Sequence, residues 1–173
     1  GLAFNLMRLI NSASLGLTRE ITSFRQAVLL LGLKRLFRWA ALLLTAARSG
    51  GSPPAVGQTA VVRGRLMELL AREFMPPEQA DQAFVIGIFS LLDQMLGMPL
   101  DAAVDLLHLP DNLAAALLQR DNVYGQLLTL TEACESDDDS RFDQAAQALS
   151  LTSQQINLAH LQALAWADQI AQA

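Results

Sequence analysis

The sequence predicts an all-α domain, and three observations support this prediction. Apolar residues make up 52% of the 173 residues and charged residues 17%, which indicates a sizeable buried core rather than disorder. Leu, Ala and Gln dominate, whereas β-branched and aromatic residues are sparse, and this composition favours helices over strands. Apolar residues recur at three- and four-residue spacing, and no stretch alternates convincingly with a period of two. We therefore expect residues 1–173 to form a single multi-helix domain without a sheet.

The best-punctuated part of the chain predicts three helices, which end at about Ser14, Gly32 and Ala47. Gly16 follows the first helix as its stop signal. Ser23 and Gln26 form a capping box at the start of the second. The chain opens with Gly1, and its first apolar positions already fit the middle of a helix. We therefore expect a truncated first helix and a chain that is a piece of a longer protein.

Glycines, prolines and an acidic link divide the rest of the chain. The predicted helices cover residues 56–74, 77–96, 100–107, 110–119, 123–135 and 142–149, and a last helix starts at 152. Pro77 suits the first position of its helix, and Gly97 ends that helix. This helix is nearly all apolar from Phe84 to Leu92, so we expect it to be the central, most buried one.

Residues 136–173 are predicted to form a C-terminal helical extension of the domain. Thr152 and Gln155 form a second capping box at the start of the last helix. We expect the apolar contacts of this helix to come from Ile156, Leu158, Leu161, Leu164, Trp166 and Ile170.

Charge and cysteine content narrow the possible functions. The 12 basic and 17 acidic side chains give a net charge of -5, which argues against general binding to a phosphate backbone. The single cysteine, Cys134, excludes an internal disulfide and fits a reducing compartment. No apolar segment approaches the roughly 20 residues of a membrane span, and no signal peptide is recognisable. We expect a cytoplasmic protein that binds no nucleic acid.

The residues that could carry chemistry do not form a recognisable site. The two histidines, His108 and His160, lack a second ligand at helical spacing. The run 137–139 consists of three aspartates but lacks the glycine and glutamate of a calcium loop, so we interpret it as a helix-capping turn. Cys134 has neither histidine near it in the sequence and is interpreted as an ordinary thiol. We therefore predict no catalytic, cofactor-binding or metal-binding residue.

Three short motifs near the start of the chain resemble one family. They read Leu6-Met-Arg-Leu-Ile-Asn-Ser-Ala-Ser-Leu-Gly16, Arg19-Glu-Ile-Thr-Ser23, and Gln26-Ala27 followed by Leu30-Leu-Gly-Leu-Lys34. In sequence and mutual spacing they resemble the HDOD family, a helical relative of the HD phosphohydrolases. The continuation 32–40 and the late Trp166-Ala-Asp168 resemble the version found behind EAL domains of cyclic-di-GMP phosphodiesterases. The resemblance implies a signalling or interaction module, whose partner is a protein or an attached EAL-type domain.

The same resemblance bears on catalysis. In HD enzymes a Gly-Leu-Leu-His-Asp helix holds metal through its His-Asp pair, and here the corresponding stretch reads Gly87-Ile-Phe-Ser-Leu-Leu-Asp93. Ser90 and Leu91 therefore stand at the ligand positions, and leucine cannot coordinate a cation. In a continuous helix Asp93 would point about 200° away from the Asp position. The expected upstream histidine has no equivalent, because that region holds Arg63 and Arg65. We predict a domain that is not an enzyme, with any phosphodiesterase activity outside this chain.

The basic cluster after Gly32 is the candidate partner surface. It comprises Lys34, Arg35, Arg38 and Trp39. Cations in the first turn of a helix are disfavoured by its dipole, so a functional reason is plausible. A solvated face and an interfacial membrane helix are the alternatives. For the chain as a whole, the alternatives to an interaction domain are a degenerate HD-type phosphohydrolase that retains nucleotide or metal binding, and a nucleic-acid-binding helical domain.

Overall fold

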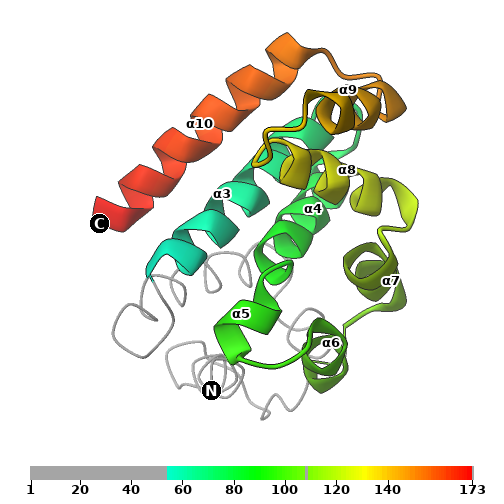
Figure 1. Ribbon diagram of the computed structural model, residues 1–173, viewed down its shortest axis with the longest axis vertical. Coiled ribbons are helices and arrows are strands. Elements are labelled where there is room, and N and C mark those ends of the chain that lie inside the picture. Colours follow the sequence, from blue (N-terminus) through cyan, green and yellow to red (C-terminus); the bar gives the residue numbers. More distant parts are fainter. Residues whose placement is uncertain (1–53, 108, 173) are drawn as a thin grey trace.

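A computed structural model of the chain describes residues 54–107 and 109–172, and every regular element in these ranges is a helix (Figure 1). This confirms the all-α prediction. The helices are α3 (Pro54–Ala71), α4 (Pro77–Phe89), α5 (Leu92–Leu96), α6 (Leu100–Leu107), α7 (Asp111–Gln119), α8 (Asn122–Ala133), α9 (Asp139–Ala148) and α10 (Ser153–Gln172). The helices predicted before residue 54, with their motifs and the basic cluster, lie outside the described residues.

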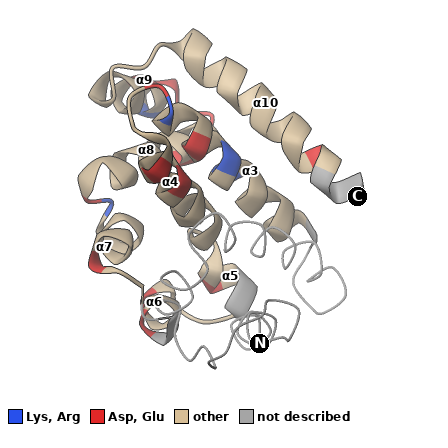
Figure 2. Ribbon diagram, turned by 180° about the vertical axis from the view of Figure 1, so that it is seen from behind, with Lys and Arg blue, Asp and Glu red and all other residues tan. Residues whose placement is uncertain are grey.

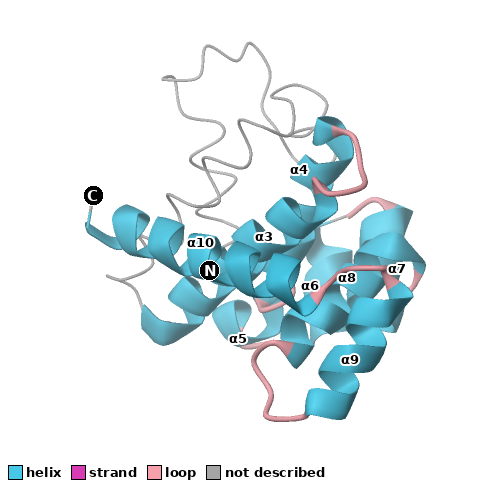
Figure 3. Cartoon of the chain, turned by 90° about the horizontal axis from the view of Figure 1, so that it is seen from above, coloured by secondary structure: helices cyan, strands magenta, loops and turns pink. Residues whose placement is uncertain are grey.

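The pair α3 and α4 forms the centre of the described part. The helix α10 runs along α3, and α8 packs across both central helices (Figures 1 and 3). The helices α7 and α9 pack against α8, and α5 and α6 follow the end of α4. None of the described helices combines the length and apolar content needed to cross a bilayer.

Two glycines bring α3 and α4 together. A Cβ atom built at Gly87 would lie 2.6 Å from both the Cα and the nitrogen of Gly64. A Cβ atom at Gly64 would lie 2.9 Å from the Cγ1 of Ile88 and 3.0 Å from the carbonyl oxygen of Phe84. Real Cβ atoms do not approach other atoms this closely, so the backbones of the two helices meet here because neither residue has a side chain.

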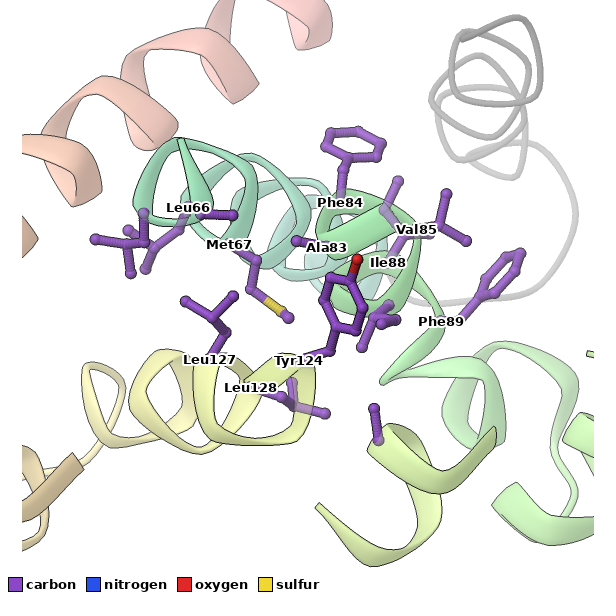
Figure 4. Close-up of a cluster of buried hydrophobic side chains, with 14 of the residues drawn as sticks. Leu66, Met67, Ala83, Phe84, Val85, Ile88, Phe89, Tyr124, Leu127 and Leu128 are labelled. Carbon is purple, nitrogen blue, oxygen red and sulfur yellow. The ribbon is translucent and has the colours of Figure 1, made fainter. Parts of the chain in front are cut away.

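The hydrophobic core lies between α3, α4 and α8 (Figure 4). Its largest fully buried side chains are Leu66, Met67, Leu70, Phe84, Ile86, Leu117, Leu127 and Leu128. Every residue from Ala83 to Ser90 is buried. The prediction that this region forms the most buried helix is therefore confirmed for α4.

The predicted helix 77–96 is wrong in one respect, because it is two helices. The helix α4 ends at Phe89 and α5 begins at Leu92, with Leu91 at φ -113° and ψ 17° between them. The Ser90 hydroxyl donates a 2.6 Å hydrogen bond to the carbonyl of Gly87, and the Leu91 amide donates to Ile88. Such three-residue bonds tighten the last turn, and a serine bonded back to its own helix favours a bend. The apolar spacing continues across the break and therefore conceals it.

Three capping predictions are confirmed, and one boundary is corrected. Gly97 takes the left-handed conformation, with φ 65°, and its amide donates to Asp93. The side chains and amides of Thr152 and Gln155 bond reciprocally as a capping box. The helix predicted at 142–149 begins earlier, at Asp139, because the Asp138 carboxylate accepts a 3.1 Å hydrogen bond from the Arg141 amide. The aspartate run is thus a helix cap, as predicted.

The predicted contacts of the last helix, α10, are confirmed for Ile156 and Trp166 but not for the three leucines. Ala159, Ala163 and Ala167 are buried, together with Ile156. The predicted contacts of three leucines are wrong, since these are exposed by 57% (Leu158), 66% (Leu161) and 42% (Leu164). Phe74, the last residue of the helix predicted at 56–74, is also exposed. Small side chains allow α10 to lie close to α3, so the leucines take the outer side.

Candidate functional site

A cluster of polar side chains lies at the break between α4 and α5. Arg63, in the middle of α3, donates two parallel hydrogen bonds to the carboxylate of Glu135, 2.8 Å from Nε to Oε1 and 2.7 Å from Nη2 to Oε2. Its third contact is a 3.1 Å bond from Nη1 to the Ser90 hydroxyl. The guanidinium thus joins α3, the end of α4 and the residue two positions beyond α8. Two-pronged bonding of this kind is among the strongest charge-assisted pairings in proteins.

The charges around Arg63 are mostly acidic. Burial alone lowers the pKa of Arg63, but the hydrogen bond and charge of Glu135, followed by the charges of Glu132 and Asp93, outweigh burial and raise the pKa above its usual value. Only 12% of the Arg63 side chain is exposed, so its charge depends on these carboxylates rather than on water. We call Arg63, Ser90, Asp93, Glu132 and Glu135 the Arg63 cluster.

Two buried side-chain oxygen atoms of the described residues have no hydrogen-bond partner, and one of them belongs to this cluster. One is Oδ1 of Asp93, and the other is Oγ1 of Thr131, whose residue is 1% exposed. Thr131 lies in the last turn of α8, next to Glu132 in the sequence. Arg120 completes the surroundings with a 2.8 Å bond from its Nε to Glu132. Basic residues of α3 are visible in Figure 2.

A second polar cluster lies on the side of α3 that faces α10. The Glu68 carboxylate, 4% exposed, accepts 2.7 Å bonds from Arg65 and from Arg72. The Arg65 guanidinium lies 5.2 Å from the ring centre of Trp166, which meets the Phe84 ring edge-on at 5.8 Å. Gln58 donates to Asp168 near the end of α10. Trp166 and Asp168 therefore attach α10 to α3.

The two positions singled out for the missing metal ligands have defined structural roles. Ser90 is buried and bonds to Gly87 and Arg63. Leu91 is 5% exposed and belongs to the core. The expectation for Asp93 is corrected, because the 200° argument assumed one continuous helix, whereas Asp93 lies on α5 and its charge acts on Arg63. Among the described residues, no group of three His, Cys, Asp or Glu side chains is arranged to hold a metal ion.

The remaining candidates are scattered. His160 is half-buried on α10, while His108 and the partner surface of Lys34, Arg35, Arg38 and Trp39 lie outside the described residues. Cys134 is half-buried, and burial, with a smaller effect from Glu135, raises the pKa of its thiol to about 11. The sequence predicts an ordinary thiol at this position, and a raised pKa makes a thiol less reactive.

Sequence reasoning missed Glu135 and the function of Arg63. Arg63 was noticed only as a residue standing where a histidine was expected, and its partner is 72 residues away. No spacing rule connects residues so far apart. The available signal was the placement of an arginine among the apolar residues of α3, Val61, Val62, Leu66 and Met67, because a buried cation requires a carboxylate partner.

Comparison with known proteins identifies the family. The pattern of the HDOD domain matches residues 1–96, which is more than half of the 173-residue chain. The chain belongs to the HDOD family. This match includes Arg63 and Ser90 and ends with α5, so the ion pair with Glu135 connects the part matched by the HDOD pattern to the helices after it.

Two relatives extend the similarity over nearly the whole HDOD chain. One is the cyclic di-GMP phosphodiesterase CdgJ of Vibrio cholerae, 29% identical over 169 residues, which are 98% of this chain and 39% of the relative. Another is the uncharacterized protein YuxH of Bacillus subtilis, 31% identical over 169 residues, which are 95% of this chain and 40% of the relative. The chain thus spans about two fifths of the length of these relatives. No solved structure matches it significantly.

Proposed function

We propose that this HDOD domain is a non-catalytic signal-transduction domain that acts through protein contacts. The observation that carries the proposal is the guanidinium of Arg63, held between Ser90 and Glu135. By resemblance to HD enzymes, the Ser90–Leu91 pair occupies the place of two metal ligands. A fixed positive charge at this place repels a divalent cation, and it uses both oxygens of the nearest carboxylate.

The relatives suggest the pathway in which such a domain would work. One of them is named as a cyclic di-GMP phosphodiesterase, and it is more than twice as long as the matched region. We place this chain in a bacterial regulatory protein of cyclic-di-GMP signalling, in the cytoplasm, attached to an EAL-type domain that carries any phosphodiesterase activity. The EAL-type attachment also draws on the resemblance of residues 32–40 and of Trp166-Ala-Asp168.

We further propose that residues 1–173 form one HDOD-like domain in which 136–173 are a C-terminal helical extension. Packing of α9 on α8 and of α10 on α3 supports this division. Contacts to both central helices support this assignment of α10, since Trp166 contacts Arg65 of α3 and Phe84 of α4.

One observation favours a second function, a degenerate phosphohydrolase that retains nucleotide or metal binding. Oδ1 of Asp93, whose charge acts on Arg63, and Oγ1 of Thr131 are buried polar atoms without a hydrogen-bond partner, and such atoms usually have one. A bound ligand would supply one. In this alternative the Arg63 cluster would open to admit the ligand.

Metal analysis and a bis-phosphoester assay on the purified chain distinguish the two functions. We expect substoichiometric metal after incubation with Mn²⁺ or Mg²⁺ and no turnover above the buffer rate. Stoichiometric metal together with turnover that a chelator abolishes would overturn the proposal. The same measurements are made on two variants. Arg63→Met removes the positive charge of the site, and the control Arg141→Met removes a charge at an exposed position of α9.

For the partner surface we propose Lys34, Arg35, Arg38 and Trp39. The experiment reverses two charges, Arg35→Glu with Arg38→Glu, and measures the melting temperature together with co-purification of a separately produced EAL-type domain. We expect lower co-purification at nearly unchanged melting temperature, because the charges of a partner surface should contribute little to the stability of the free domain. A large fall in melting temperature would mean that these residues are structural. Arg141→Glu serves as the control charge reversal.

A further inference from the structure

The helix α10 is amphipathic in an unusual sense, because three alanines and Ile156 face the protein while three leucines face outward. Every fourth residue of the buried side is an alanine, Ala159, Ala163 and Ala167. Three of the five exposed large hydrophobic side chains in the described part of the chain are Leu158, Leu161 and Leu164 on this helix. Packing against α3 does not require leucines at these positions. A row of exposed leucines marks a surface that another protein covers.

The same face carries almost no charge. Between Ser153 and Gln172, the only Asp, Glu, Lys or Arg is Asp168, and Figure 2 shows α10 as an almost uncoloured rod along one edge of the described part. Helices that lie on membranes carry lysines or arginines on their polar side, and nucleic acid requires a basic surface. The exposed polar residues are instead amides, such as Gln154 and Asn157. These features favour a protein partner with an equally uncharged apolar helix.

The arrangement of the leucines is symmetric about Leu161. Leu158 and Leu164 lie three residues to either side, which is 60° to either side around the helix at about 100° per residue. In an antiparallel pair of two such helices, a twofold axis through Leu161 places Leu158 opposite Leu164 of the second copy. The same axis places Gln154 opposite Asp168, so that an amide donor faces the only carboxylate. A surface that complements itself under a twofold axis is what a symmetric dimer needs.

We propose that the exposed face of α10 is a homodimerisation surface, and that its partner is α10 of a second copy of this chain in antiparallel orientation. This inference deepens the proposed function, because it identifies one protein contact of a domain that acts through contacts. The helix is about 30 Å long and about 10 Å wide, so the pair buries roughly 600 Å² in total, about half of what a stable dimer needs. The dimer is therefore weak and depends on protein concentration.

Sedimentation velocity of the 173-residue chain over a concentration series tests the proposal. We expect the weight-average mass to rise from monomer towards dimer between about 10 μM and about 1 mM. Leu161→Glu places two like charges together on the twofold axis, and we expect at least about a tenfold weaker dimer. Leu118→Glu is the matched control, because Leu118 is an exposed leucine on α7. A monomer throughout the series, or equal weakening by both variants, overturns the proposal.

Disulfide trapping tests the orientation of the two helices. In a Cys134→Ser background, Leu161→Cys lies on the axis and should crosslink to its own counterpart under mild oxidation. Leu118→Cys should remain reduced at the same protein concentration. Gln154→Cys should crosslink when mixed with Asp168→Cys but hardly when alone. Equal crosslinking of Leu161→Cys and Leu118→Cys, or efficient crosslinking of Gln154→Cys alone, contradicts the antiparallel pair. None of these results depends on metal or turnover. A failure of the dimer proposal can therefore be distinguished from a failure of the proposed function.

Discussion

The helices α4 and α10 both lie against α3 through small residues, yet they differ in what covers their outer faces. Gly87 of α4 meets Gly64, and all residues from 83 to 90 are buried. The alanines of α10 lie on α3, while its leucines are exposed. Close approach to the central helix therefore does not make a helix part of the core. A helix becomes core when a second layer covers its other side, and α10 lacks that layer within the described residues.

The polar contacts of α3 differ in the same way. Arg63 bonds to residues of other segments, Ser90 and Glu135, so its loss removes a tertiary connection. Arg65 and Arg72 bond to Glu68 on their own helix, so either can be lost while the carboxylate keeps one partner. The side of α3 that faces α8 should thus be more sensitive to substitution than the side that faces α10.

Among the substitutions that test this comparison, Gly87→Ala should have the largest effect on the free energy of unfolding. The added Cβ would lie 2.6 Å from the Gly64 backbone, so the two central helices have to separate. We expect a loss of about 3 kcal/mol in the free energy of unfolding, the upper end of the range for overpacking. Urea unfolding followed by circular dichroism measures it. Gly97→Ala is the control, since nothing lies near its Cβ and only its positive φ is unfavourable, with an expected cost of about 1 kcal/mol.

Arg63→Met should have the second largest effect, with a loss of about 2 kcal/mol in the free energy of unfolding. The substitution keeps most of the length of the side chain but removes charged hydrogen bonds, each of which contributes about 1.5–3 kcal/mol, with part of this offset by exposure of Glu135. A double-mutant cycle with Glu135→Gln isolates the pair, and the two losses should be strongly non-additive. Additive losses would contradict a direct interaction. Arg72→Met provides the matched comparison and should cost less, because Glu68 keeps Arg65.

Trp166→Leu should cost about 1 kcal/mol, because it keeps an apolar side chain but removes the cation–π contact with Arg65 and the edge-on contact with Phe84. Its effect should be local. Amide hydrogen exchange should become faster along α10 while α4 stays protected. Equal acceleration in both helices would show that α10 is part of the same cooperative unit as the core.

The smallest effect concerns the Cys134 thiol. Burial raises its pKa from 9.0 to about 11, so at pH 8 it should react with iodoacetamide about 100-fold more slowly than a thiol of ordinary pKa. The pKa of the thiol is higher in the folded than in the unfolded protein. Its contribution to the free energy of unfolding is therefore complete below about pH 9 and is lost between about pH 9 and about pH 11. Mass spectrometry of alkylated protein over this pH range measures the reaction. Fast labelling at pH 8 would mean that the thiol is exposed.

Local sequence patterns predicted the class of the fold and most helix ends, because caps and turns depend on neighbouring residues. The capping box at Thr152, the turn at Gly97 and the cap at Asp138 are of this kind. The break after Phe89 was not predicted, since it depends on where the Ser90 hydroxyl bonds. Hydrophobicity alone also placed Leu158, Leu161 and Leu164 inside, whereas the protein buries the alanines beside them.

The candidate site was predictable only in part, for the same physical reason. The ligand positions Ser90 and Leu91 could be found by resemblance, and an unreactive Cys134 by its surroundings. The pairing of Arg63 with Glu135 required α8 to be placed against α3. Periodicity describes which side of a helix is apolar, but it does not say which other helix lies there. The residues of the Arg63 cluster could therefore be seen individually and not as a group.

The repeat of alanine on α10 has a consequence for the position of this helix along α3. An alanine at every fourth residue makes the contact surface nearly identical after a shift of four residues, about 6 Å. Alanines alone would hold the helix in place without defining its register. The register is set by the few side chains that do not repeat: Trp166 against Arg65, with Gln155 bonded to Glu73 near one end and Asp168 to Gln58 near the other.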